Sequence, residues 1–327
     1  MVIVAKFVCE LLLLLQFEKS VDLMKKQRMP YQNWIFVILA VLIVAVWGST
    51  FSATKILLIE GMSPMGIFFS RFVLGYLILL TVSRKKILAN TVTDELKFLT
   101  IGILGGSLYY FLQNTALSMS QTTNVSFLLS FCPLITIVLS VIFFKDQQIS
   151  RNFCFGLMVA ICGVFFVLFN GHFELHISPM GDILALLAAT SWAVYSQIIR
   201  PLTTRYSIRL MSRKVFFYGW VTALPLFLLG PYKSDIVLMT KPEVMLNLLY
   251  MTLFASVFCY MGWNVIIQKL GPVRSASFLY LDPFFSTVFS FLFMKEVMTL
   301  SLAMGLVLIL LGVLVAQNRL IPKLHNK

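Results

Sequence analysis

Two charged residues within apolar stretches are the first candidates for chemistry in this 327-residue chain. Arg71 lies seven residues beyond Pro64, where one apolar stretch begins, and Asp282 directly precedes Pro283 in another. At about 1.5 Å per residue, Arg71 would lie roughly 10 Å inside a membrane helix, where an isolated charge is expensive. Either it reaches back to the membrane surface, or it faces water, a ligand or an acid such as Glu60 or Asp282. Arg71 and Asp282 are therefore candidates for reading the charge of a solute or for exchanging a proton.

Aromatic and amide side chains recur at helical spacing in two apolar stretches. The i, i+3, i+4 spacing places each of two sets on one helix face: Tyr110, Gln113 and Asn114, and Tyr260, Trp263 and Asn264. Such groups at membrane depth need partners, either on neighbouring helices or in a solute. Interhelical hydrogen bonding and the lining of a shared polar chamber are the two interpretations, and the presence of the pattern in both stretches favours the chamber.

Small and hydroxylic residues also recur at corresponding depths. The stretch WGSTFSAT begins at Trp47 and includes Ser49, and the stretch TSWAVYS includes Trp192 and Tyr195. Small residues allow helices to approach closely, and hydroxyl groups can line a polar path. Close packing and a solute cavity remain alternatives, and these four residues are candidate cavity residues.

An internal repeat relates the two halves of the chain. Shifted by 150 positions, residues 114–146 align without a gap on residues 264–296, which places Pro133 on Pro283 and Lys145 on Lys295. Each proline removes a backbone donor, so we expect a helix kink near mid-membrane at Pro133 and Pro283. Such a kink serves packing or lines a wet cavity. The halves differ where Cys132 aligns with Asp282.

The composition places the chain in a membrane. It is 59% hydrophobic and 12% charged, with a mean hydropathy of +0.92, which is too little polar surface for a soluble globule. Apolar runs of roughly 20 residues predict ten spanning helices, near residues 34–58, 64–83, 96–118, 122–144, 151–170, 180–200, 214–230, 244–268, 275–294 and 299–317. Because the runs are apolar on all sides, an all-α membrane protein is expected rather than a barrel.

The net charge of +13 indicates an orientation rather than a nucleic-acid partner. Most basic residues fall in alternate loops, and the opposite loops hold only Lys233, Lys241 and Lys295. The positive-inside rule then places both termini in the cytoplasm. We expect a multi-pass protein of the cell inner (plasma) membrane, with membrane lipid around it.

The remaining segments carry no expected chemistry. Residues 1–33 contain only a short apolar run, and residues 1–23 are interpreted as an upstream start or floppy tail, or as a short interfacial helix. His172, Glu174 and His176 are spaced for a weak metal site, but a solvated loop is the preferred interpretation. Neither a catalytic constellation nor a cofactor motif is found, so no enzyme, metal or cofactor is predicted.

The order of the spans predicts the architecture. Five spans are an odd number, so a second copy of a five-span unit must enter the membrane from the opposite side, as in inverted-repeat transporters. The predicted organisation is a tail (1–33), a first five-helix repeat (34–170), an extracytoplasmic connector (171–179), a second repeat (180–317) and a cytoplasmic tail (318–327).

The sequence resembles the EamA-like branch of the drug/metabolite transporter (DMT) superfamily. The resemblance rests on WGSTFSATK (47–55), SPMGIFFSRF (63–72), and a proline followed by a Lys-acid pair and two spaced glycines in each half, at 133–164 and 283–313. It implies a 5+5 inverted-repeat permease with a central cavity, commonly an exporter of amino acids or other small metabolites.

The hypothesis from sequence is a secondary transporter that works by alternating access. Its partners would be a small-molecule metabolite such as an amino acid and, as a coupling ion, a proton, without nucleic acid. A passive facilitator or channel is the first alternative, because it shares the same helices. A membrane-embedded lipid-linked transferase is the second and less favoured alternative.

Overall fold

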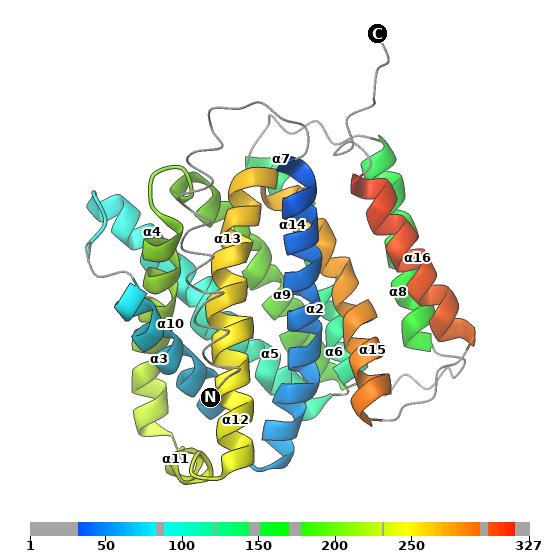
Figure 1. Cartoon of the computed structure of the whole chain (residues 1–327). Helices are drawn as coiled ribbons and strands as arrows, with labels where there is room; N and C mark the ends of the chain where they lie inside the picture. Colours follow the sequence, from blue (N-terminus) through cyan, green and yellow to red (C-terminus); the bar gives the residue numbers. More distant parts are fainter. Residues whose placement is uncertain are drawn as a thin grey trace.

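The computed structural model describes residues 32–82, 88–120, 122–143, 151–169, 178–230, 232–294 and 300–317. All regular structure in these ranges is helical (Figure 1). The expectations for the N-terminal tail, the connector histidines, Lys145, Lys295 and the C-terminal tail concern residues outside the described ranges.

The helices form one bundle. The first half of the chain contributes α2 (Gln32–Ile59), α3 (Pro64–Val82), α4 (Val92–Gly102), η1 (Ile103–Ser107), α5 (Leu108–Met119), α6 (Thr122–Leu129), α7 (Cys132–Phe143) and α8 (Arg151–Phe169). The second half contributes α9 (Pro179–Ile199), η2 (Arg200–Leu202), α10 (Ile208–Leu229), α11 (Lys233–Leu238), α12 (Pro242–Tyr250), η3 (Met251–Phe258), α13 (Cys259–Leu270), α14 (Pro272–Ser277), η4 (Phe278–Tyr280), α15 (Leu281–Met294) and α16 (Leu300–Gln317).

Several of these helices are long and apolar enough to cross a bilayer. Five stretches among the described residues meet both criteria: Ile35–Ile59, Pro64–Val82, Val125–Phe143, Pro179–Leu202 and Pro242–Leu270. Two shorter apolar helices, Arg151–Phe166 and Met304–Ala316, accompany them. The prediction of an all-helical membrane protein is confirmed at this level.

Irregular helical turns interrupt long helical stretches in both halves of the chain. η1 and η3 are π-helical, and they join α4 to α5 and α12 to α13. In a π-helix the regular i to i−4 bonding is broken, so carbonyl oxygens become available to other helices. The indole Nε1 of Trp47 donates to the Ala255 carbonyl at 2.9 Å, and the Ser191 hydroxyl donates to the Leu104 carbonyl at 2.7 Å. The irregular turns therefore join helices from the two halves.

The helices near the two aligned prolines are also interrupted. α6 ends at Leu129 and α7 begins at Cys132, one residue before Pro133. The 3-10 turn η4 separates α14 from α15, which begins two residues before Pro283. Since proline has no N–H, no regular helical bond can reach the carbonyl four residues earlier. Both breaks lie inside the bundle rather than at its ends.

The first helix of each half packs against interrupted helices of the other half. α2 packs against α13 and α15, while α9 packs against α5, α6 and α7. α3 packs against α10, and α8 lies alongside α16 at the edge of the bundle (Figure 1). The centre of the bundle is thus bounded by α2 and α9 and by the interrupted helices that contact them.

Candidate functional site

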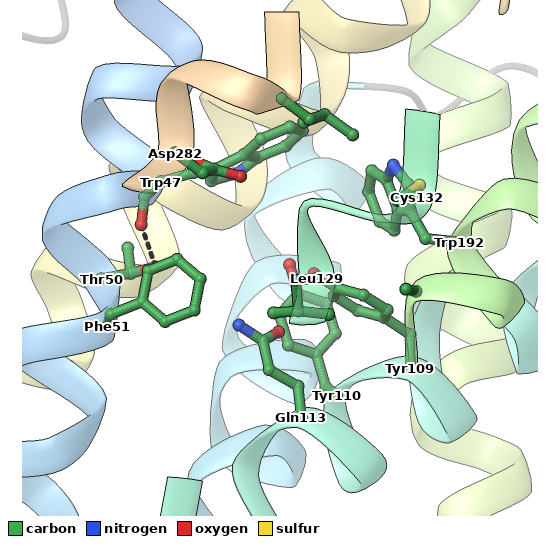
Figure 2. Close-up of a pocket in the computed structure, with 12 residues that line it drawn as sticks. Trp47, Thr50, Phe51, Tyr109, Tyr110, Gln113, Leu129, Cys132, Trp192 and Asp282 are labelled. Atoms are coloured by element: carbon green, nitrogen blue, oxygen red, sulfur yellow. Dashed lines mark hydrogen bonds between the residues drawn. The ribbon is translucent and has the colours of Figure 1, made fainter. Parts of the chain in front are cut away.

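A cavity lies where α2, α5 and α9 meet the breaks of the interrupted helices (Figure 2). Its volume is about 40 Å³, enough for roughly three water molecules at ~10–15 Å³ each. The lining side chains are mostly apolar or aromatic: Trp47, Thr50 and Phe51 from α2; Tyr109, Tyr110 and Gln113 from α5; Leu129 and Cys132 beside the first break; Ala189 and Trp192 from α9; and Leu279 and Asp282 beside the second break.

Aromatic rings form much of the cavity wall. The ring centroids of Trp47 and Trp192 are 5.5 Å apart in an edge-to-face arrangement, and those of Tyr109 and Trp192 are 4.8 Å apart. Tyr109 and Tyr110 are also edge-to-face, with centroids 4.9 Å apart. Aromatic pairs of this geometry hold one another in place beyond their area of contact. The wall is therefore well ordered around the cavity.

Three buried polar atoms of the lining have no hydrogen-bond partner among the described residues. They are the carboxylate Oδ1 of Asp282, the amide Oε1 of Gln113 and the indole Nε1 of Trp192. Buried polar atoms in proteins are bonded in the great majority of cases, so three orphans around one cavity call for an explanation. Two are acceptors and one is a donor, and all three belong to residues that line the cavity.

The interruptions of the helices place these residues. Leu129 and Cys132 flank the break between α6 and α7, and Leu279 and Asp282 occupy the aligned positions beside η4. Both pairs line the cavity because each break directs a turn of its helix toward the centre of the bundle. The unequal pair, Cys132 and Asp282, makes the cavity chemically asymmetric.

Five of the candidate residues from the sequence line this cavity: Trp47, Tyr110, Gln113, Trp192 and Asp282. The prolines 133 and 283 lie next to lining residues. The candidate residues also include Tyr195, Tyr260 and Trp263, which pack behind the lining. Tyr195 is 4.9 Å from Trp192 and Trp263 is 5.0 Å from Trp47, measured between ring centroids.

Arg71 lies behind the cavity wall. Its side chain is 2% exposed, and its guanidinium donates to the Ser256 hydroxyl from Nε at 3.2 Å and from Nη2 at 3.0 Å. The guanidinium carbon is 4.9 Å from the centroid of the Tyr110 ring, within the range of a cation–π interaction. Among the described ion pairs, Arg71 has neither Glu60 nor Asp282 as a partner; Glu60 pairs with Lys241 instead. Arg71 therefore contacts Tyr110 of the lining without being a lining residue itself.

Three other candidates make hydrogen bonds between helices. The Asn114 amide donates to the Pro64 carbonyl at 3.1 Å, and Ser49 bonds the Tyr250 hydroxyl at 2.5 Å. Asn264 accepts from the Tyr195 hydroxyl at 3.0 Å and donates to the Ser212 hydroxyl at 3.1 Å. These contacts correspond to the packing interpretation of the amide faces.

Tyr109, Thr50 and Phe51 also line the cavity, although they were not among the sequence candidates. Helical spacing groups Tyr110 with Gln113 and Asn114, whereas the structure directs Tyr109, Tyr110 and Gln113 to the cavity. Tyr109 lies one position before Tyr110 on the same helix, outside the i, i+3, i+4 set, so grouping by that spacing leaves it out.

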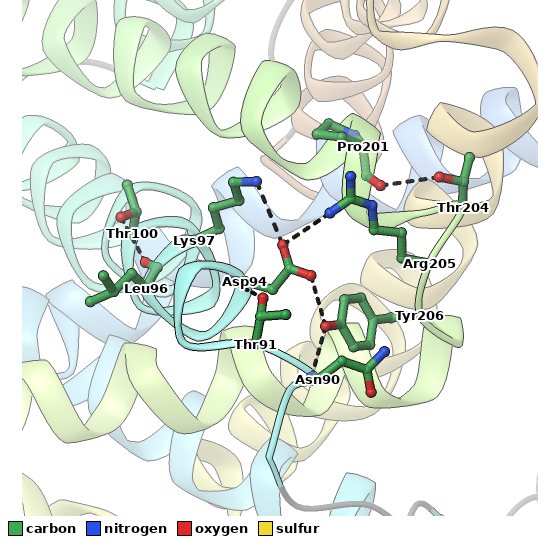
Figure 3. Close-up of polar contacts among 10 residues, drawn as sticks. All are labelled: Asn90, Thr91, Asp94, Leu96, Lys97, Thr100, Pro201, Thr204, Arg205 and Tyr206. Atoms are coloured by element: carbon green, nitrogen blue, oxygen red, sulfur yellow. Dashed lines mark hydrogen bonds and ion pairs between the residues drawn. The ribbon is translucent and has the colours of Figure 1, made fainter.

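A polar cluster joins the two halves at the end of the bundle where α4 begins, called here the α4 end (Figure 3). The Asp94 carboxylate accepts from the Tyr206 hydroxyl at 2.9 Å and pairs with Arg205 at 3.4 Å and Lys97 at 3.5 Å. The local sequence forms this cluster because the Thr91 hydroxyl caps α4, accepting from the Asp94 N–H at 3.1 Å.

Glu95 makes the second set of contacts at the α4 end. It pairs with Lys214 of α10, accepts from the Tyr218 hydroxyl, and accepts from the Ala89 N–H at 2.7 Å. Burial alone would raise the pKa of Glu95, but these hydrogen bonds outweigh it and hold the pKa below its usual value of 4.5. The hydrogen bond from Tyr206, with help from Arg205, likewise lowers the pKa of Asp94.

These shifts predict acid sensitivity at the α4 end. A carboxylate whose pKa is lower in the folded state stabilises the fold fully above its unfolded pKa. The contribution is lost as the pH falls through and below 4.5, the usual pKa of Glu95. We expect the melting temperature in detergent to fall as the pH is lowered through this range, and Glu95→Gln to reduce that slope. Glu243→Gln, at an exposed position of α12, is the control, and an equal slope in both variants would contradict the assignment.

The opposite end of the bundle, where α11 lies (Figure 1), has its own contacts between the halves. The Asp235 carboxylate on α11 accepts from the Ser63 N–H at 2.8 Å and from the Ser63 hydroxyl at 2.6 Å. Lys241 pairs with Glu60 at 3.2 Å. The cavity therefore lies between two sets of polar contacts, one at each end of the bundle.

Comparison with known proteins identifies the family. The family model described as the EamA-like transporter family matches residues 34–169 and, a second time, residues 179–317. An uncharacterized transporter from Archaeoglobus fulgidus is 26% identical over 280 residues, which cover 84% of this chain and 95% of the relative. A probable terminal-alkyne amino-acid exporter from Streptantibioticus cattleyicolor is 24% identical over 282 residues, covering 85% of this chain and 92% of that protein.

A solved crystal structure supports the fold. It superposes with a TM-score of 0.68 over 86% of this chain and 98% of the other, at 18% sequence identity. The twofold match of the family model spans nearly all of the described residues, and the relatives that it joins are transporters rather than enzymes. The chain belongs to the EamA-like transporter family of the drug/metabolite transporter superfamily.

Proposed function

We propose that this transporter is a secondary carrier that exports amino acids or other small metabolites through the central cavity by alternating access. The observation that carries the proposal is the cavity itself. It lies between helices of both halves, three polar atoms of its lining have no partner among the residues that the structure describes, and the helices beside it are interrupted. Interrupted helices at membrane depth are typical of transporter binding sites, where free backbone and side-chain groups face the solute.

The alternating mechanism requires two related halves, and we propose an inverted repeat of two five-span units, residues 34–170 and 180–317. Three observations support it. The family model matches the chain twice. The packing of α2 on α13 and α15 corresponds to that of α9 on α5, α6 and α7. Aligned positions of the two halves, Leu129 with Leu279 and Cys132 with Asp282, line one cavity.

The proposed substrate class and orientation follow from the relatives and from the charge distribution. One relative is named as a probable amino-acid exporter, which supports a small metabolite with an amino group as cargo. The basic loops favour cytoplasmic termini, which would place the α4 end in the cytoplasm of an inner-membrane protein. Asp282 is the proposed residue for proton coupling, because it is the ionisable carboxylate of the cavity lining.

Filling the cavity should stop transport without unfolding the protein. Ala189 is fully buried and lines the cavity, so Ala189→Leu would place three additional carbon atoms in a space of about 40 Å³. We expect transport of amino acids and amines into liposomes to fall at least tenfold, as the side chain occupies the solute's position. Uptake of labelled solutes by reconstituted protein is the measurement.

The matched control is Leu187→Ala on the same helix. Leu187 is 49% exposed and points away from the core, so its truncation should leave uptake close to that of the unmodified protein. If Ala189→Leu takes up solute at the same rate as the unmodified protein, the solute path lies elsewhere. If the wild-type protein moves no amino acid, amine or organic ion with or without a pH gradient, the carrier proposal is wrong.

A further inference from the structure

The cavity lining contains an acidic side chain and, among the lining residues that the structure describes, no basic one. Asp282 is the acidic side chain of the lining, and none of the lining residues is Lys, Arg or His. The nearest cation described above, Arg71, is not among the lining residues; it lies over the Tyr110 ring and is bound to Ser256. An anionic solute group in this cavity would meet a carboxylate without a facing cation. A cationic group would meet its opposite charge.

The unpartnered acceptors match an ammonium group. The Oδ1 of Asp282 and the Oε1 of Gln113 are both buried and both unbonded within the described structure. Figure 2 shows the two side chains entering the cavity from different sides, Asp282 above and Gln113 below in that view. A primary ammonium group carries three N–H donors and no acceptor. It can therefore bond both oxygens, which a carboxylate or a carbonyl group cannot do.

The aromatic wall adds a second attraction for the same charge. Trp47, Phe51, Tyr109, Tyr110 and Trp192 line the cavity. The faces of such rings are electron-rich and attract cations, most strongly when water is excluded. The volume of about 40 Å³ suits an ammonium head group, and the inference concerns that group.

We propose that the cavity recognises the primary ammonium group of its solute, with Asp282 and Gln113 accepting its hydrogen bonds and the aromatic rings facing its charge. This inference rests on the proposed carrier function and names the chemical group that the carrier selects. An amine and an amino acid both supply the group, and the test separates these two sources.

Three probes with a common carbon skeleton test the inference on the full-length protein in detergent. Butylamine carries an ammonium group, butyrate a carboxylate, and 2-aminobutyrate both. A ligand that binds only the folded state raises the melting temperature in a concentration-dependent way. We expect butylamine to raise it at concentrations at least tenfold lower than butyrate does. Equal or stronger stabilisation by butyrate would overturn the inference. If 2-aminobutyrate raises the melting temperature at the same concentrations as butylamine, amino acids are the source of the ammonium group. If it requires higher concentrations, simple amines are the source.

Variants assign the effect to Asp282. In Asp282→Asn, we expect the concentration of butylamine needed for stabilisation to rise at least tenfold, and in Asp282→Glu to stay closer to that of the wild type. Glu243→Gln makes the same charge change at an exposed position and should leave the response unchanged. An unchanged response in Asp282→Asn would overturn the assignment. The comparison of butylamine with butyrate uses the wild-type protein alone. The inference can therefore still be tested if one of the variants folds poorly.

The outcome distinguishes this inference from the carrier proposal. Binding of butylamine is an equilibrium property measured without a membrane, whereas transport is measured across one. Reconstituted protein that moves other solutes but does not prefer the ammonium probe would contradict only the inference about the head group. Binding of the probe without movement of any amine across the membrane would contradict the carrier proposal and leave the binding site in place.

Discussion

Replacement of Gly156 by isoleucine is expected to separate α8 from α16 and to destabilise the protein by about 3 kcal/mol, at the upper end of the usual cost of overpacking. The two helices lie backbone against backbone. A Cβ atom at Gly156 would collide with the Ala316 backbone nitrogen and would lie 2.6 Å from the Gly312 carbonyl oxygen. Because backbone atoms cannot rotate out of the way, the helices must move apart.

The same contact recurs along this helix pair. A Cβ atom at Gly163 would lie 2.6 Å from the Ile309 backbone nitrogen and 2.7 Å from the Gly305 carbonyl oxygen. The spaced glycines of the two halves thus face one another, as small residues do where membrane helices pack closely. Gly163→Ile should therefore have an effect similar to that of Gly156→Ile.

The effect is measured as thermal unfolding in detergent, monitored by the loss of monodisperse protein on heating. The control is Met158→Ile on the same helix, because the Met158 side chain is 62% exposed on the outer surface. We expect a large drop in melting temperature for Gly156→Ile and little change for Met158→Ile. Equal melting temperatures for the two variants would show that α8 and α16 do not depend on this close approach.

Replacement of Asp282 by asparagine is expected to have opposite effects on transport and on stability. Transport should fall at least tenfold, because the proposed carrier loses the carboxylate of its cavity. The free energy of unfolding should rise by about 1–2 kcal/mol, because a buried carboxylate oxygen without a described partner is replaced by a neutral group that is less costly to bury. A trade of stability for function is typical of binding sites.

Two measurements on one preparation test this prediction. Uptake into liposomes, with and without a pH gradient, reports transport and its dependence on protons, and thermal unfolding in detergent reports stability. Unchanged uptake and unchanged pH dependence would remove Asp282 from the solute path and from proton coupling. A fall in both uptake and melting temperature would indicate a structural role instead.

Much of the fold could be predicted because a membrane simplifies the sequence signal. Apolar stretches of spanning length indicated an all-helical membrane protein, and the aligned motifs around Pro133 and Pro283 indicated a repeat. The spaced glycines of the family resemblance lie where α8 and α16 pack closely. These features depend on composition and short-range spacing, which are visible in one chain.

The site was harder to predict because it depends on irregular backbone. Trp47, Tyr110, Gln113, Trp192 and Asp282 were candidates that the structure brings to one cavity. Leu129 and Leu279 line the cavity beside the helix breaks, and regular helical periodicity contains no information about where a helix breaks.

Contacts between segments that are distant in the sequence could not be predicted either. Arg71 is bound to Ser256, 185 positions away, rather than to either acid that its depth suggested. The cluster of Asp94 and Glu95 with Arg205, Tyr206 and Lys214 likewise joins α4 to residues more than 100 positions away. Each of these residues taken alone resembles an ordinary loop or helix-end residue.

The most direct test of the central claim is counterflow in liposomes that contain the purified wild-type protein. Liposomes preloaded with unlabelled solute are diluted into labelled solute of the same kind, chosen from the amino acids or amines that the protein transports. A carrier that alternates its cavity between the two sides predicts transient accumulation of label above its external concentration, driven by the unlabelled solute that leaves. Label that only equilibrates, at a rate independent of preloading, would contradict alternating access and indicate a passive pore.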